Sequence, residues 1–259
     1  MTRTRLKFLL SGTAALLLAA CGTAAPATAA LTPSPLTGTV AVSAAASLTG
    51  PFKAIASAFE AQHPGVRVQL NLSGTPILVA QIEQGAPTDV FASADTANMD
   101  ALTAAGFTSG TPRVFAHNRL EIVVAPGNPK GITGLAGLAR PDVLYISEAA
   151  TVPAGRYSIQ ALARAGVSAT PKSLETDVKS VIAKVELGEA DAGIVYSTDV
   201  AAAGTRVSGV TIPEQFNVVA TYPVVAVRGG HADLATAFIA YLLSPAGQST
   251  LAAYGFIHA

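Results

Sequence analysis

The alternation of two hydrophobic periods along the chain constrains the fold more than any other feature. Apolar and polar residues alternate strictly over residues 66–72, as in a half-buried strand, whereas Phe52, Ile55, Ala56 and Phe59 recur at helical spacing. The same switch from strand to helix recurs up to about residue 256. Because a helix follows most strands, neighbouring strands must run parallel and have their faces covered. The sequence therefore predicts an α/β fold with mainly parallel sheets.

Two of the predicted strands end in hydroxyl-bearing residues at the start of a helix. Ser47 follows the first strand, and Thr75 follows the second, with Pro76 at a first-turn position where its missing N–H costs least. A helix N-terminus carries unpaired N–H groups and partial positive charge. Ser47 and Thr75 therefore either cap their helices or help to hold an anion.

The N-terminal residues differ from all that follow. Arg3, Arg5 and Lys7 precede an apolar run that is too short to span a membrane, which predicts a signal peptide over residues 1–20. Cys21 is the only cysteine and follows Leu18-Ala-Ala, which resembles the lipobox of bacterial lipoproteins. We therefore expect an exported protein on the periplasmic side of the cell envelope, anchored through lipid on Cys21. Residues 21–37 are small, uncharged and interrupted by prolines, as in a flexible tether.

Composition and motifs exclude several classes of function. Sixteen basic residues balance sixteen acidic ones without a basic run, which argues against a nucleic-acid partner. The chain contains no Gly-x-Ser-x-Gly elbow, phosphate loop or His-Glu-x-x-His helix, and no histidines at metal-ligand spacing. Asp89 and Asp95 are either an acid–base pair, or one of them caps a helix while the other fixes a loop. We predict a binding protein without a cofactor, the enzyme alternative being a secreted serine hydrolase.

Five segments of the chain, in order, closely resemble the molybdate-binding proteins of bacterial ABC transporters. The segments are Ala44-Ala-Ala-Ser47-Leu-Thr, Gln81-Ile-Glu-Gln-Gly-Ala-Pro-Thr-Asp-Val-Phe-Ala-Ser-Ala-Asp95, Val152-Pro-Ala-Gly155, Thr176-Asp-Val178 and Gly193-Ile-Val-Tyr196. The resemblance covers about residues 39–256. It implies a ligand that bridges two lobes, consistent with the polar strand ends, since ligands of open α/β sheets bind at the carboxyl ends of strands.

The resemblance also implies a periplasmic binding protein fold of type II. Residues 38–118 and 224–259 would form a discontinuous first lobe, and residues 119–223 an inserted second lobe. Two extended crossings, near residues 117–123 and 220–225, would form the hinge beside the ligand cleft. The second crossing belongs to a long apolar run, 218–227, in which Pro223 indicates either an edge strand or a passage between lobes.

By the same resemblance, five residues would bind the ligand: Ser47, Thr75, Ala154, Val178 and Tyr196. Serine, threonine and tyrosine would donate O–H groups, whereas alanine and valine can offer only backbone N–H groups. Ser73 is the alternative to Thr75 as the source of the second hydroxyl. Such neutral donors suit a tetrahedral dianion in a cleft that excludes water.

The implied ligand is molybdate, or tungstate of nearly the same shape, with molybdenum held only as the oxyanion. The implied partner is the permease of an ABC transporter, and the implied state is a monomer. Another oxyanion, such as sulfate or phosphate, is the alternative ligand.

Overall fold

The computed structural model describes residues 1–2 and 36–259. The predicted signal peptide, lipidated Cys21 and tether lie outside the described residues, apart from residues 1, 2, 36 and 37. Within the described part of the chain, no helix has the length and apolar character needed to cross a membrane.

The strands form one continuous mixed sheet. They are β1 (Gly38–Ala45), β2 (Val66–Ser73), β3 (Val90–Ala92), β4 (Thr108–Val124), β5 (Tyr145–Glu148), β6 (Leu174–Glu175), β7 (Ala192–Tyr196), β8 (Ser208–Thr211) and β9 (Val219–Val227). Across residues 36–259 their order is β2-β1-β3-β9-β4-β7-β5-β6, with β8 also paired to β4. The outer pairs, such as β1 with β2 and β5 with β7, are parallel. The central pairs that involve β4 and β9 are antiparallel, so the sheet is mixed rather than mainly parallel.

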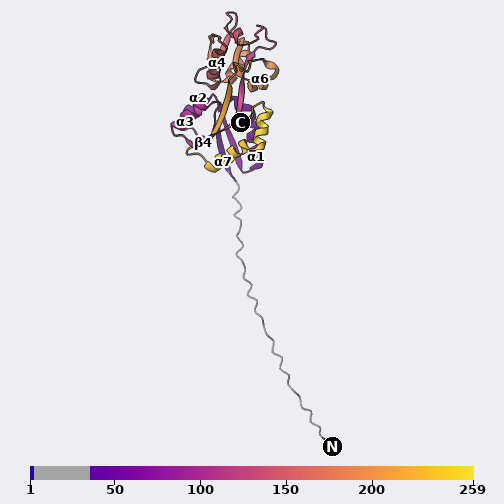
Figure 1. Ribbon diagram of the computed structural model, residues 1–259. Helices are drawn as coiled ribbons and strands as arrows, with labels where there is room; N and C mark the ends of the chain where they lie inside the picture. The colour runs from indigo at the N-terminus through magenta and orange to yellow at the C-terminus, as the bar shows by residue number, and fades with distance from the viewer. Residues whose placement is uncertain (3–35) are drawn as a thin grey trace. The chain divides into compact units, whose positions relative to one another are not determined.

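Strands β4 and β9 divide this sheet into two halves. The first half contains β1–β3 with α1 (Thr49–Gln62), α2 (Thr75–Glu83), α3 (Thr96–Ala104), α7 (Ala232–Leu243) and α8 (Pro245–Ala253). The second half contains β5–β8 with α4 (Pro153–Arg164), α5 (Val178–Glu186) and α6 (Ser197–Ala203). In Figure 1, α4 and α6 lie at one end of the domain and α1, α2, α3 and α7 at the other. Residues 108–119 of β4 pair with β9, and residues 120–124 pair with β7.

The predicted apolar faces form the core of the first half. Phe52, Ile55 and Phe59, which recur at helical spacing, are all fully buried in α1. The ring of Phe59 packs edge-on against that of Phe238 from α7, with centroids 5.4 Å apart. On the other face of the sheet, α2 and α3 bury a separate cluster that includes Leu78 and Met99. Both faces of the first half are thus covered, as the strand–helix alternation requires.

Strand β9 is central, so the edge-strand interpretation of Pro223 is wrong. It lies between β3 and β4. Pro223 is opposite Val114 at a point where the β4–β9 register shifts before Ala116. Such an irregularity tolerates a residue without an N–H, because the ladder is already interrupted there.

A carboxyl group is buried without a partner in the second half. Glu148, the last residue of β5, is 1% exposed, and neither of its carboxyl oxygens has a hydrogen-bond partner. Burial raises the pKa of Glu148 well above its usual 4.5, and the negative charges of Asp199, Asp177 and Glu175 raise it further. Ionising such a group would require burying an unpaired charge. The folded protein therefore retains this proton at pH values where the unfolded chain has lost it.

This proton makes the stability of the fold depend on pH. As pH rises above about 4.5, the unfolded chain ionises at Glu148 while the folded chain does not, so stability present at low pH is lost. Glu148→Gln cannot ionise, so its free energy of unfolding should fall less between about pH 4 and pH 7. The difference is about 1.4 kcal/mol for each pH unit between 4.5 and either the folded-state pKa or pH 7, whichever is lower. Urea unfolding at both pH values measures it, with Glu214→Gln, whose side chain is 83% exposed, as the control. Equal losses in the Glu148→Gln variant and the unaltered protein would contradict this account.

Candidate functional site

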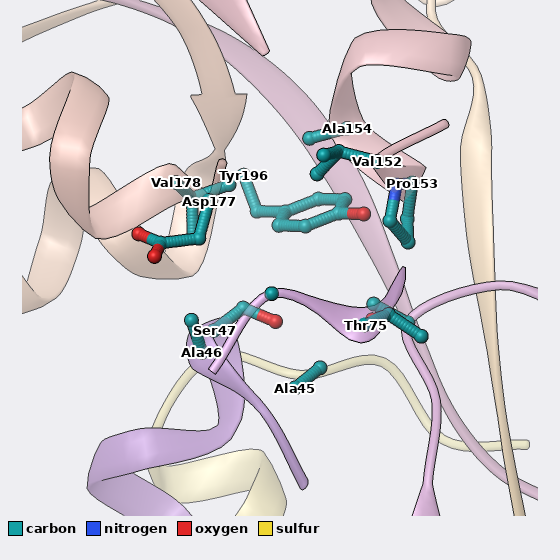
Figure 2. Close-up of a pocket in the computed structure, with 12 residues that line it drawn as sticks. Ala45, Ala46, Ser47, Thr75, Val152, Pro153, Ala154, Asp177, Val178 and Tyr196 are labelled. Carbon is teal, nitrogen blue, oxygen red and sulfur yellow. The ribbon is translucent and has the colours of Figure 1, made fainter. Parts of the chain in front are cut away.

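A small pocket lies where the first and second halves of the sheet meet. It has a cavity volume of about 20 Å³, far below the roughly 300–1,000 Å³ of sites for drug-sized ligands. Its lining comes from both halves: Ala45, Ala46, Ser47, Gly74, Thr75, Ala94, Val152, Pro153, Ala154, Asp177, Val178 and Tyr196. All five residues that the sequence singled out are in this lining, and Figure 2 shows Ser47 and Thr75 facing Tyr196 across it.

Ser47 does not cap the helix that follows it. It lies in η1 (Ala46–Leu48), one turn of 3-10 helix between β1 and α1. No side chain caps the start of η1 or of α1. Its Oγ instead lies 3.0 Å from the hydroxyl oxygen of Tyr222. The capping interpretation of Ser47 is therefore wrong, and its hydroxyl is held at the pocket by a tyrosine of β9.

Thr75 presents an unpartnered hydroxyl to the pocket. It is the first residue of α2 and is 1% exposed, yet its Oγ1 has no hydrogen-bond partner. Neither Thr75 nor any other side chain caps α2, and Pro76 occupies the first turn as the sequence predicted. Ser73, the alternative, ends β2 and does not line the pocket. Burying a hydroxyl without a partner is costly, so its orientation calls for an acceptor in the pocket.

Tyr196 places a second unpartnered hydroxyl on the opposite side. It ends β7, is 1% exposed, and its OH has no hydrogen-bond partner. Its ring packs edge-on against Tyr222, with centroids 5.7 Å apart, which fixes its direction. Burial raises the pKa of Tyr196 well above its usual 10. The side chain therefore stays neutral and keeps its O–H as a donor.

Two helices of the second half begin at the pocket. Helix α4 starts after Val152 with no side-chain cap, so the N–H of Ala154 has no side-chain acceptor. Helix α5 starts at Val178 after Asp177, whose carboxylate accepts from the N–H of Ser180 at 2.9 Å. This cap of α5 was missed at the sequence level. In Figure 2 the carboxylate of Asp177 points away from the hydroxyl of Tyr196, as expected from its bond to Ser180.

At two glycines near the pocket, another backbone segment lies closer than a side chain would allow. A Cβ on Gly74 would lie 2.2 Å from the carbonyl oxygen of Thr176, in the other half of the molecule. A Cβ on Gly155 would lie 2.3 Å from the carbonyl oxygen of Ala149, so α4 can pack against the end of β5 only with glycine there. Gly74 thus lets the two halves touch, and Gly155 gives a physical reason for the glycine of Val152-Pro-Ala-Gly155.

Neutral hydrogen-bond donors make the pocket suitable for an anion. Among the described residues that line it, none is Lys, Arg or His, and Asp177 is the only charged one. Two buried hydroxyls lack acceptors, and the uncapped starts of α2 and α4 carry unpaired N–H groups. Donors that converge in this way from helix starts bind an anionic acceptor.

Tyr222 supports the site from behind and was missed in the sequence. It is fully buried, and burial raises its pKa, so it stays neutral and can bond to Ser47. Its ring also packs edge-on against Phe256, with centroids 5.4 Å apart. The only signal in the sequence for a role of Tyr222 was its position before Pro223 in a long extended run. No local pattern links Tyr222 to Ser47.

The two aspartates considered as an acid–base pair have separate structural roles. Asp95 caps α3 by accepting from the N–H of Asn98 at 3.0 Å. Asp89 fixes a loop by accepting from the N–H groups of Ala41 and His231, each at 2.6 Å. No cluster of potential metal ligands occurs within the described part of the chain.

The comparisons with known proteins agree on one family. Residues 40–257 match the family model described as bacterial extracellular solute-binding protein. A relative from Mycobacterium tuberculosis H37Rv, named molybdate-binding protein ModA, is 39% identical over 240 residues, which is 92% of this chain and 92% of the relative.

Solved structures of two binding proteins share the fold. The periplasmic molybdate-binding protein of Azotobacter vinelandii superimposes with a TM-score of 0.73 at 21% identity, over 85% of this chain and 99% of the other. The sulfate-binding protein SubI of M. tuberculosis has a TM-score of 0.78 at 21% identity, over 85% of this chain and 86% of the other. The periplasmic binding fold of type II, expected from the sequence, is confirmed.

Proposed function

Since the chain belongs to the bacterial extracellular solute-binding protein family, we propose that it captures molybdate in this pocket and delivers it to an ABC transporter. The observation that carries the proposal is the pair of buried hydroxyls, on Thr75 and Tyr196, that face one pocket without acceptors. The 39% identity to a protein named for molybdate binding supports the choice of anion.

We propose that five residues hold the oxyanion. Ser47, Thr75 and Tyr196 donate O–H groups, and Ala154 and Val178 donate backbone N–H groups from the first turns of α4 and α5. Hydrogen bonds to a charged acceptor contribute about 1.5–3 kcal/mol each, so five such donors suffice without a basic residue. Molybdenum is then held only through the oxygens of the anion, which is a transported ligand and not a cofactor.

The alternatives have less support. Sulfate or phosphate would fit a pocket of neutral donors, but the likeness to a sulfate-binding protein at 21% identity concerns the fold alone. The relatives are substrate-binding proteins of transporters and not enzymes, which argues against a secreted hydrolase. Tungstate, with nearly the same shape as molybdate, is proposed as a second ligand.

We also propose that the two halves act as lobes that close on the anion. The first lobe comprises residues 38–118 and 224–259, and the second residues 119–223, joined through β4 and β9. Donors from both lobes contact the anion only when the cleft is closed, so the anion shifts the equilibrium toward the closed form. The closed monomer then docks on the permease, and lipid on Cys21 keeps the exported protein at the membrane.

Calorimetric titration of the full chain with sodium molybdate, tungstate, sulfate and phosphate tests the ligand. Molybdate and tungstate should bind with similar affinity and at least about tenfold more tightly than sulfate and phosphate, a preference of about 1.4 kcal/mol. Tighter binding of sulfate would replace molybdate by sulfate as the ligand. Binding of none of the four would overturn the proposal.

Removal of one unpartnered hydroxyl tests the site. Thr75→Val keeps the side-chain shape but loses the donor, so Kd for molybdate should rise roughly 5- to 150-fold, which corresponds to about 1–3 kcal/mol. Tyr196→Phe should have an effect of the same size. Ser73→Ala is the matched control, since Ser73 lies outside the pocket lining and its loss should leave Kd unchanged. A response to Ser73→Ala but not to Thr75→Val would move the second hydroxyl to Ser73.

The close approach at Gly74 tests lobe closure. Gly74 has φ −57° and ψ 135°, which alanine adopts freely, but the new Cβ would meet the carbonyl oxygen of Thr176. Gly74→Ala should therefore hinder closure and weaken molybdate binding by about tenfold or more, about 1.4 kcal/mol, while the midpoint of thermal unfolding without ligand changes little. Gly134→Ala is the control, because its Cβ would meet no atom within 4 Å. Equal affinity of both variants would contradict closure by this contact.

A further inference from the structure

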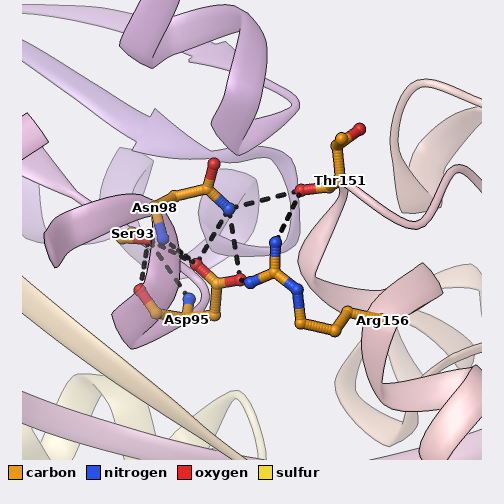
Figure 3. A network of polar contacts seen from close by, with 5 residues as sticks. All are labelled: Ser93, Asp95, Asn98, Thr151 and Arg156. Carbon is orange, nitrogen blue, oxygen red and sulfur yellow. Dashed lines mark hydrogen bonds and ion pairs between the residues drawn. The ribbon is translucent and has the colours of Figure 1, made fainter. Parts of the chain in front are cut away.

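Two charged residues contact each other from opposite halves beside the pocket. Nη1 of Arg156, in α4, donates to Oδ2 of Asp95, at the start of α3, over 2.5 Å (Figure 3). A second bridge runs alongside, from Nδ2 of Asn98 to the carbonyl oxygen of Thr151 over 3.3 Å. Asp95 and Asn98 belong to the first half, and Thr151 and Arg156 to the second, so these bonds exist only when the halves are together.

The carboxylate of Asp95 is held in place from within the first half. Its Oδ1 accepts from the N–H of Asn98 at 3.0 Å, and the side chain of Asn98 donates to both carboxylate oxygens. The Ser93 hydroxyl donates to the backbone oxygen of Asp95 at 2.6 Å. Asp95 is only 1% exposed in this arrangement. A fixed, buried carboxylate is a better partner for an arginine than a mobile surface one, because little side-chain freedom is lost when the pair forms.

Arg156 occupies a helix position that disfavours its positive charge. It lies in the first turn of α4, where the helix dipole disfavours a positive charge. Its guanidinium does not line the pocket and is engaged by Asp95 instead. The sequence of α4 alone gives no reason for an arginine at this position. The reason lies across the cleft, in Asp95.

The pair adjoins the pocket on both sides. Ala94, directly before Asp95, lines the pocket, and so do Pro153 and Ala154, in the same helical turn as Arg156. A movement that brings the start of α4 onto a bound anion therefore also brings Arg156 onto Asp95. An interaction made only in the closed form raises the apparent affinity of any ligand that requires closure.

We propose that Asp95 and Arg156 are positioning residues that stabilise the closed form of the cleft and so set the affinity for the anion without touching it. This inference rests on the proposed function for its ligand, but the geometry of the pair is independent of which anion binds. The pair acts on the equilibrium between open and closed forms, so its loss weakens every ligand of the pocket by the same factor.

A double-mutant cycle tests the pair. The full chain, Asp95→Asn, Arg156→Gln and the double variant are titrated with sodium molybdate by calorimetry. Asparagine is as good a helix cap as aspartate, so Asp95→Asn keeps an acceptor for the start of α3. It removes the charge and replaces the oxygen that accepts from Arg156 by an NH2 group, which cannot accept. Each single variant should bind roughly 3- to 10-fold more weakly, and the double variant no more weakly than the singles.

Arg140→Gln is the matched control. Arg140 pairs with Asp142 at 2.7 Å, but both residues belong to the second half, so their pair does not respond to closure. Its loss should leave Kd unchanged. Unfolding midpoints without ligand should be similar for all variants, whereas a residue that only supports the fold would lower them.

Small-angle X-ray scattering without ligand separates this inference from the proposed function. Arg156→Gln and Asp95→Asn should give a larger radius of gyration than the unaltered chain and Arg140→Gln, because the open form gains population. If the unaltered chain binds none of the oxyanions, the proposed function fails. The scattering then still tests whether the Asp95–Arg156 pair stabilises the closed form. Additive effects on Kd, or an unchanged radius of gyration in both variants, would overturn the inference.

Discussion

The antiparallel pairing of β4 with β9 is the constraint on which the other features depend. These strands hold both halves in one sheet, from Thr108 opposite Val227 to Arg119 opposite Val219. Beyond that point β4 continues against β7 and β8. The turn after β1 that carries Ser47 and the end of β7 that carries Tyr196 are thereby brought to the same pocket, although they are far apart in the sequence. Tyr222 of β9 contacts both, by a hydrogen bond to Ser47 and by ring packing on Tyr196.

The pocket combines charge neutrality with incomplete hydrogen bonding. Most buried polar atoms in a folded protein have partners, so two partnerless hydroxyls in one small pocket require an explanation. The buried Tyr196 remains neutral because burial opposes its ionisation. The N–H groups of α2 and α4 are equally neutral and equally fixed. A site of this kind favours an anion through oriented dipoles and avoids burying a lysine or arginine next to it.

Several residues near the pocket are explained only by contacts between the halves. Gly74 leaves room for the carbonyl oxygen of Thr176, and Arg156 occupies a helix start that would otherwise favour a negative charge. Local preferences are violated at these positions because the tertiary contact outweighs them. Glu148 is a different case, since burial raises its pKa and neither of its carboxyl oxygens has a hydrogen-bond partner in the described structure.

The sequence by itself determined the elements whose residues carry their own periodicity. The helical spacing of Phe52, Ile55 and Phe59 predicted α1, and Pro76 predicted the start of α2, because such patterns depend only on neighbouring residues. The resemblance of five short segments indicated the family and the five residues that line one pocket. Residues 108–119 of β4 carry no strand pattern and are extended only because they pair with β9.

Tertiary structure alone decided the hydrogen bonding of the site. Whether Ser47 caps a helix or bonds to Tyr222 depends on a residue 175 positions away. The cross-cleft partner of Arg156 lies 61 positions away, in another half of the sheet. Such contacts leave no periodic or local signal, because they arise only when the two central strands have brought the halves together.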